Sequence, residues 1–217
     1  MYLKRLLVIS ASIISICIAP KSYAVAGSDG MVDVPEGDFQ SGVGKKAATV
    51  NVGKFSIDKF EVTNAQYHTF KKGFNIPAGK EKNPVGEISY FEAEAYCKSV
   101  GKRLPTRNEW EKAARGTDGR LYPWGNKFDQ AKANTVESEK GGSTPVGSYE
   151  NGKSPYGAMD MAGNVWEWVN EWEGADKKYR LALGGSYFDD EENASVVSIL
   201  KSIPDDMHEY VGFRCAK

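Results

Sequence analysis

The alternation of apolar and polar residues predicts short strands near both ends of the chain, with helices between them. A strand is predicted at residues 31–34, a second begins at Phe39, and residues 50–60 alternate like a hairpin that turns at Gly53-Lys54. Two more short strands are predicted near the end, at residues 196–200 and 210–215.

Three capping boxes predict where three helices begin. In each, a Ser or Thr is followed three residues later by Glu or Gln, so that the two residues can satisfy each other's free backbone N–H groups. The pairs are Thr63 with Gln66, Ser89 with Glu92 and Thr106 with Glu109, and the predicted ends are Gly73, Gly101 and Gly116. The residues after Gly116 show no periodicity, and bound ions or aromatic side chains are the usual means of ordering such a segment.

The stretch YGAMDMAGNVWEWVNEW, residues 156–172, carries the densest chemistry in the chain. A strand through Trp166, Glu167 and Trp168 places both indoles on one face and the carboxylate on the other. Gly163 precedes Asn164, and both tolerate the positive φ of a tight turn. Asp160 and Glu167 therefore flank a turn, and two carboxylates with backbone carbonyls suit Ca²⁺. The alternative is that the tryptophans fill a core and the carboxylates cap turns or face water.

The first residues have the pattern of a secretory signal peptide. Lys4 and Arg5 precede an apolar run over residues 6–19, and Ser22-Tyr23-Ala24 is a small-x-small cleavage site, which puts cleavage near Ala24 or Ala26. Ile16 stands where a lipoprotein signal needs a small residue before Cys17, so lipidation is not expected. We expect residues 1–24 to be removed, residues 25–30 to form a linker, and no membrane span to remain.

The charge of the chain excludes one class of partner. It has 28 basic and 29 acidic residues, and removal of residues 1–24 takes three basic residues and no acidic one. The protein that remains after cleavage is mildly acidic and has no basic patch, so a nucleic-acid partner is not expected.

The three cysteines limit the possible thiol chemistry. Loss of Cys17 with the signal peptide leaves Cys97 and Cys215, which in an oxidising compartment most simply form one disulfide. The alternative is a pair of free reactive thiols. Zinc, serine hydrolase, Walker and dinucleotide motifs are all absent from the sequence, and an acidic run such as residues 189–192 more often forms a solvated loop than a glycosidase site.

Five motifs occur together and in order, and they give the chain a family resemblance. They are GKRLPTRNEWEKAARG from Gly101, YPWGN from Tyr122, DMAGNVWEW from Asp160, GGS from Gly184 and GFRC from Gly212. From about Met31 to Lys217 the chain resembles the formylglycine-generating enzyme, or sulfatase-modifying factor, family. The resemblance implies one domain over residues 31–217 with an α+β, C-type-lectin-like fold that is poor in regular structure and ordered partly by calcium.

The resemblance also implies specific site residues. A calcium ion would be held by the side chains of Asp160 and Glu167 and by the carbonyls of Gly163 and Val165. A second would involve Asn134 and the carbonyl of Thr135, with Glu137 or Glu139 replacing ligands from a segment that is shortened here. A family disulfide corresponds to Cys97 and Cys215.

The catalytic part of the resemblance fails. The family's enzymes follow Gly-Gly-Ser-Tyr with two cysteines that bind copper, but Asp189 and Ala194 stand at those positions here. Copper is therefore not expected, because Cu(I) needs soft thiolate ligands, and we predict no conversion of cysteine to formylglycine.

The functional prediction is a secreted or periplasmic, calcium-stabilised pseudoenzyme. It would bind a peptide, a protein or a polar small molecule at the former active-site pocket, formed by Ser186, Tyr187, Asp189 and Asp190. One alternative is a periplasmic oxidoreductase of the same family that acts on a peptide-derived substrate, with Asp189 and Ser186 as candidate catalytic residues. Another is a structural subunit of an envelope assembly.

Overall fold

The chain begins with a long, two-stranded antiparallel ribbon. The structure, a computed structural model, describes residues 30–217, so the predicted signal peptide lies outside the described residues, as do residues 25–29 of the predicted linker. Strand β1 (Met31–Val34) pairs with β4 (Phe55–Asp58), and β2 (Gly37–Ser41) pairs with β3 (Ala48–Val52). The ribbon reverses direction through a 3₁₀ turn, η2 (Gly44–Lys46).

The predicted hairpin around Gly53-Lys54 is wrong in its pairing, although both of its strands exist. Val34 lies opposite Phe55 and Gly37 lies opposite Val52, so the two ladders are segments of one ribbon. Pro35 and Glu36 therefore lie opposite Gly53-Lys54, and this pair of residues interrupts the ribbon instead of turning it. Proline lacks the N–H that a ladder needs, which accounts for the break on that side.

All three predicted capping boxes are present. Thr63, Ser89 and Thr106 each accept the backbone N–H of the residue three positions on, and that residue's side chain reaches back to the cap. The helices that follow are α1 (Asn64–Phe70), α2 (Tyr90–Ser99) and α3 (Arg107–Arg115). Gly101 and Gly116 follow α2 and α3 with positive φ values of 71° and 74°, as expected for glycines that end helices.

A four-stranded sheet completes the regular structure, in the order β7-β6-β5-β8. Its strands are β5 (Trp166–Trp172), β6 (Arg180–Leu183), β7 (Ile199–Ser202) and β8 (Val211–Gly212). Strand β8 is parallel to β5, and the other neighbours are antiparallel. Strand β7 begins later than the strand predicted at residues 196–200, and β8 is shorter than the strand predicted at residues 210–215.

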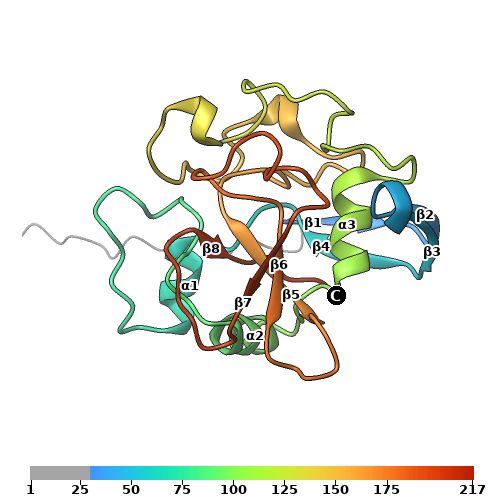
Figure 1. The fold of residues 1–217 in the computed structure, drawn as a ribbon. Helices are drawn as coiled ribbons and strands as arrows, with labels where there is room; N and C mark the ends of the chain where they lie inside the picture. Colours follow the sequence, from blue (N-terminus) through green and yellow to red (C-terminus); the bar gives the residue numbers. More distant parts are fainter. Residues whose placement is uncertain (1–29) are drawn as a thin grey trace, which may run out of the picture.

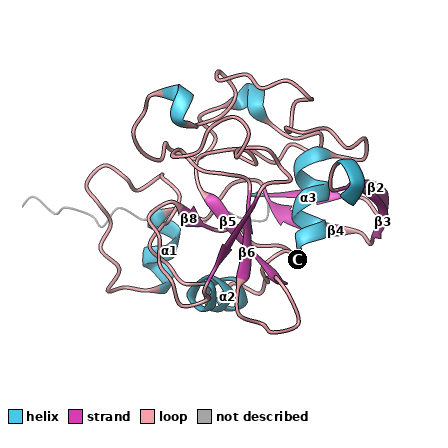
Figure 2. Ribbon diagram, viewed as in Figure 1, coloured by secondary structure: helices cyan, strands magenta, loops and turns pink. Residues whose placement is uncertain are grey.

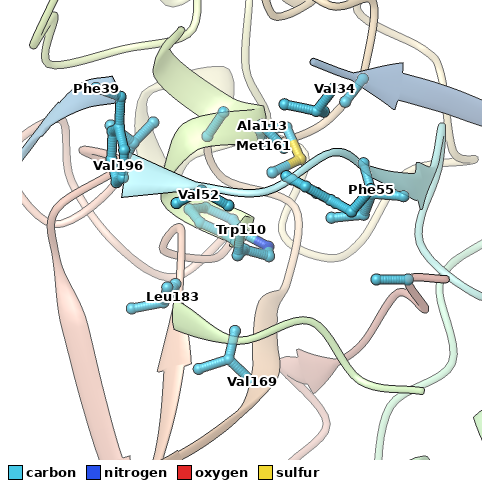
Figure 3. Packing of buried hydrophobic residues seen from close by; sticks show 14 of the residues in the cluster. Val34, Phe39, Val52, Phe55, Trp110, Ala113, Met161, Val169, Leu183 and Val196 are labelled. Carbon is cyan, nitrogen blue, oxygen red and sulfur yellow. The ribbon is translucent and has the colours of Figure 1, made fainter. Parts of the chain in front are cut away.

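Strand β5 separates two hydrophobic clusters. Trp166 and Trp168 belong to the cluster that also contains buried residues of α1 and α2, whereas Val169 belongs to the cluster that contains Trp110 and Ala113 of α3. Both indoles therefore lie on one face of the strand, as the alternation predicted. Figure 3 shows the second of these clusters, in which Trp110 lies between Val52 of the ribbon and Leu183 of the sheet.

An irregular layer lies at one end of the molecule (Figure 1). In Figures 1 and 2 this layer, at the top, consists mostly of loops from the segment between α3 and β5, and it includes the short 3₁₀ helices η3 (Val136–Ser138) and η4 (Glu150–Gly152). The sequence predicted this long irregular segment. Its position above the sheet brings it close to the residues that carry the candidate site.

The expected disulfide links Cys97 on α2 to Cys215 after β8. The two cysteines are separated by 118 residues. A crosslink that closes a loop of this length contributes about 4–5 kcal/mol in the chain-entropy model. Within residues 30–217, no helix has both the length and the apolar composition to cross a membrane.

Replacement of Thr106 with Ala removes the cap of α3, and we expect it to lower the free energy of unfolding by about 1 kcal/mol. The cause is the loss of the acceptor for the Glu109 N–H, at 3.3 Å. Chemical denaturation measures the effect. The matched control is Thr106→Ser, which keeps the hydroxyl, and an equal loss in both variants would contradict the capping role.

Candidate functional site

The centre of the site is a buried ion pair between Glu167 and Arg214. Glu167 lies on β5, on the face opposite the two indoles, and it is fully buried. Its Oε2 accepts hydrogen bonds from Arg214 Nε at 2.6 Å and from Trp110 Nε1 at 2.8 Å, and its Oε1 accepts one from Arg214 Nη2 at 2.7 Å. An ionised carboxylate has about four acceptor positions, so one remains on Oε1.

The guanidinium of Arg214 has all its donors satisfied. Nη1 donates to the carbonyls of Asp58 and Lys59, both at 3.1 Å, and Nη2 also donates to the carbonyl of Met159 at 2.8 Å. The guanidinium is planar and holds its five N–H groups in fixed directions, so it can bind a carboxylate and several carbonyls at once. The side chain thus connects the ribbon, the irregular layer and the sheet.

Two further carboxyl groups lie beside this pair. Asp160 adopts a positive φ of 57°, and its Oδ2 accepts the N–H of Gly147 at 2.6 Å. The charge of Asp160 also raises the pKa of the second carboxyl group, Glu61, after the larger effect of burial.

The sequence interpretation missed Glu61. Its Oε1 accepts Asn164 Nδ2 at 2.8 Å, but its Oε2 is buried without a hydrogen-bond partner among residues 30–217. A single signal was available, because Glu61 stands between Phe60 and Val62 just before the first helix cap, and Val62 is buried. Its partners lie about a hundred positions away in the sequence, so spacing alone did not reveal them.

Burial and mutual repulsion govern the ionisation of this cluster. Burial, and then the charge of Asp160, raise the pKa of Glu61 well above its usual range. Burial also raises the pKa of Asp160, although the Gly147 N–H and Arg214 act in the opposite direction. Burial alone would lower the pKa of Arg214, but Glu167 outweighs it and the pKa is raised. Either a proton on Glu61 or a bound cation can relieve the repulsion.

The predicted turn at Gly163-Asn164 is present, with φ values of 74° and 65°. A Cβ on Gly163 would lie 2.4 Å from the carbonyl oxygen of Asn134, so only glycine allows this approach. The contact places the two predicted calcium sites side by side.

At the second predicted site, the polar groups are already engaged with protein partners. Asn134 Oδ1 accepts the hydroxyl of Ser138 at 2.7 Å, and its Nδ2 donates to the carbonyl of Gly142 at 3.0 Å. Glu137 accepts the Thr135 hydroxyl at 2.6 Å and the N–H of Glu191 at 3.1 Å. Glu139 is exposed. A calcium ion at Asn134 and Thr135 stays a prediction.

The residues of the predicted pocket are mostly turned into the protein. Ser186 is fully buried, and its hydroxyl donates to Asp189 Oδ2 at 2.5 Å. The same oxygen accepts the Ser186 N–H at 3.0 Å and Trp166 Nε1 at 2.8 Å. Tyr187 is buried, and burial raises its pKa to about 12. Asp189 therefore closes a tight turn against the sheet.

The surface of the same segment is aromatic and acidic. Phe188 is 57% exposed, and its ring contacts those of Tyr187 and Tyr210 at centroid distances of 4.4 and 5.7 Å. Asp190 is exposed and accepts the backbone and side-chain N–H groups of Asn193. Ala194 is fully buried.

Within the described residues there is neither a free thiol nor a group of side chains that is arranged to hold a metal ion without backbone ligands. Both cysteines in residues 30–217 form the disulfide. No three side chains of His, Cys, Asp or Glu converge there as a preformed metal centre. A cation near Asp160 would thus need backbone carbonyls among its ligands.

Comparison with known proteins gives the following similarities. Residues 19–217 match the family model described as "Sulfatase-modifying factor enzyme 1-like domain". The chain is 39% identical over 150 residues to "Inactive C-alpha-formylglycine-generating enzyme 2" of Bos taurus, a match that covers 61% of this chain and 50% of that protein. The chain spans about half the length of the first curated relatives that it matches.

Two solved structures share the fold. "Treponema denticola variable protein 1" superposes with a TM-score of 0.77 at 20% identity and covers 86% of this chain and 94% of that one. The structure of PvdO from Pseudomonas aeruginosa gives 0.74 at 21% identity, with 86% and 93% covered. At these identities the similarity shows the fold alone. The predicted α+β, C-type-lectin-like fold is confirmed.

Replacement of Arg214 with Met leaves three buried carboxyl groups without their cation, and we expect it to lower the free energy of unfolding by about 3–5 kcal/mol. Chemical denaturation measures the loss. The matched control is Arg103→Met, which breaks the Arg103–Glu109 pair, where the Arg103 side chain is 45% exposed. A surface pair contributes at most about 1 kcal/mol, so similar losses in the two variants would contradict the central role of Arg214.

Proposed function

Because the chain belongs to the sulfatase-modifying factor, or formylglycine-generating enzyme, family, we propose that it is a member without formylglycine-generating activity. In this proposal it is exported to the periplasm or the exterior, is stabilised by calcium, and binds a peptide or polar ligand near residues 186–190. The observation that carries the proposal is that Asp189 and Ala194 stand where the family's enzymes have their two catalytic cysteines. Asp189 is held there by Ser186 and Trp166, and Ala194 is buried.

The absence of a copper site follows from the same residues. A carboxylate and a methyl group offer no soft ligand for Cu(I), and the sulfurs of Cys97 and Cys215 are joined to each other. The name of the bovine relative, which describes an inactive enzyme, supports this proposal.

Exposed aromatic side chains support a binding role. Phe188 and Tyr210 pack edge to face beside the turn of Asp189, and Phe188 remains more than half exposed. Aromatic rings at a surface offer large contact areas at a low cost in conformational entropy. An oxidoreductase that used Asp189 is the weaker alternative, because one oxygen of that carboxylate already accepts three hydrogen bonds.

Calcium is proposed at the cluster around Asp160. The predicted ligands are the carboxylates of Asp160 and Glu167 with the carbonyls of Gly163 and Val165. The residues present fit a cation in two respects: Glu61 Oε2 has no partner among residues 30–217, and Glu167 Oε1 keeps one acceptor position. Carboxylate and carbonyl oxygens are the ligands that Ca²⁺ prefers. The ion would compensate the buried negative charge that Arg214 leaves unbalanced.

Calcium is expected to raise the melting temperature. A concentration one hundred times Kd stabilises by about 2.7 kcal/mol, which raises Tm by roughly 5–10 °C for a domain of this size. Differential scanning calorimetry with calcium, and with a chelator, measures the shift. Asp160→Asn combined with Glu61→Gln should abolish it.

The matched control is Glu111→Gln, which alters another buried carboxylate that is paired with Arg115 outside the cluster. It should lower Tm but keep the calcium-dependent shift. An unchanged Tm of the unmodified protein in calcium would rule the site out.

The catalytic proposal has its own test. The purified protein, supplied with copper and oxygen, should leave the cysteine of a sulfatase-motif peptide unmodified, because no thiolate is available to bind copper. Mass spectrometry of the peptide gives the readout, with an active formylglycine-generating enzyme as the positive control. Appearance of the aldehyde would overturn the assignment.

A further inference from the structure

A pocket of about 660 Å³ lies in the irregular layer at the top of Figure 1, outside the proposed calcium cluster. Its walls include two aromatic residues and five charged ones: Trp124, Phe128, Lys127, Asp129, Lys132, Glu137 and Glu191. Glu191 belongs to the acidic loop of residues 189–192, which begins at Asp189, so this loop connects the pocket to the turn formed by Ser186 and Asp189.

The aromatic wall is fixed in place by its own packing. Trp124 stacks on Tyr122 with a centroid distance of 5.4 Å and an interplanar angle of 10°, and Phe128 packs against both rings. Trp124 Nε1 donates to the carbonyl of Lys127 at 2.9 Å. The Tyr122 hydroxyl donates to the carbonyl of Glu191 at 2.9 Å, which joins the aromatic wall to the acidic loop.

A cation of the protein itself already occupies one side of this wall. Lys132 Nζ lies 5.9 Å from the centre of the Trp124 ring, and it pairs with Asp129 at 3.3 Å. A cation over the face of an indole is attracted by the quadrupole of the ring. The wall therefore provides the geometry that a cationic group needs, next to a carboxylate.

The opposite wall carries the carboxylates of Glu137 and Glu191, and Lys127 also lines the pocket. Glu137 accepts hydrogen bonds only from the Thr135 hydroxyl and the Glu191 N–H, and both donors are uncharged. Neither Glu137 nor Glu191 forms an ion pair with any residue from 30 to 217. Burial, followed by the charges of Glu191, Glu192, Glu137 and Asp190, raises the pKa of Tyr122. Three carboxylates, Asp129, Glu137 and Glu191, line the pocket against two lysines, Lys127 and Lys132, so the lining carries one net negative charge.

We propose that this pocket binds a lysine or arginine side chain of a peptide or protein, with the cation between the Trp124 ring and the carboxylates of Glu137 and Glu191. The inference rests on the proposed binding function and deepens it, because it names the class of ligand and places its charged group. It is independent of calcium and of the loss of catalysis.

Because Lys132 already lies over the Trp124 ring, the proposal predicts that its removal strengthens ligand binding instead of weakening it. Lys132 competes for the same ring and adds a like charge to the pocket, so Lys132→Ala is expected to strengthen binding. Trp124→Ala and Glu191→Gln are expected to weaken it. A purely structural role for these residues would not produce opposite effects.

The test is isothermal titration calorimetry of the purified protein with a short peptide that has blocked ends and one lysine as its only charged residue. The control peptide has norleucine in place of lysine, which keeps the aliphatic stem and removes the charge. We expect the norleucine peptide to bind about tenfold more weakly, consistent with one cation–π contact and one partly exposed ion pair. Binding of the lysine peptide should also weaken as salt concentration rises.

The control variant is Glu150→Gln, which removes an exposed carboxylate outside the pocket and should leave binding unchanged. Trp124→Phe, which keeps an aromatic ring, guards against misfolding of the Ala variant, and it should bind with intermediate affinity. Equal binding of the two peptides, no binding of either, or weaker binding after Lys132→Ala would overturn the proposal.

Phe188→Ala separates this inference from the proposed function. If Phe188→Ala abolishes binding and Trp124→Ala does not, the ligand lies at residues 186–190, which overturns the pocket and keeps the proposed function. If neither peptide binds to any variant, both proposals lose their support for a cationic ligand.

Discussion

The buried contact between Arg214 and Glu167 is the interaction on which the rest of the structure depends. Arg214 follows the last strand, and Glu167 lies in the strand that divides the two hydrophobic clusters. The other donors of the guanidinium bind carbonyls at the end of the ribbon and in the irregular layer. A charge so deeply buried is tolerated only when all its partners are in place. The position of each of these segments is therefore tied to the position of the others.

The same contact explains how a domain with little regular structure keeps a defined shape. Arg214 joins the irregular layer to the sheet through the Met159 carbonyl and Glu167, and within the layer Gly163 lies against the carbonyl of Asn134. Hydrogen bonds to buried charges are stronger than those between neutral groups. They fix loops that have no ladder of their own, and the two proposed binding sites both lie in or beside the loops so ordered.

Local signals made part of this structure predictable. The capping boxes at Thr63, Ser89 and Thr106 were correct because each depends on residues three positions apart. The alternation at Trp166 to Trp168 gave the correct faces of β5 for the same reason. The pairing of the ribbon was missed, because Gly53-Lys54 has the composition of a turn and its actual role is set by Pro35 across the ladder. Glu61 was missed because its partner Asn164 is 103 residues away.

The arrangement of the last segment bears on how the protein folds during synthesis. Residues 211–216 supply strand β8, the guanidinium at the centre of the molecule and one half of the disulfide. Until these residues leave the ribosome, β5 lacks one of its two neighbouring strands, and Glu167 has no guanidinium with which to pair. Folding must therefore follow the synthesis of residue 216 instead of proceeding from the first residues onward. The completed core depends on contacts between distant parts of the chain, and such contacts form more slowly than local ones.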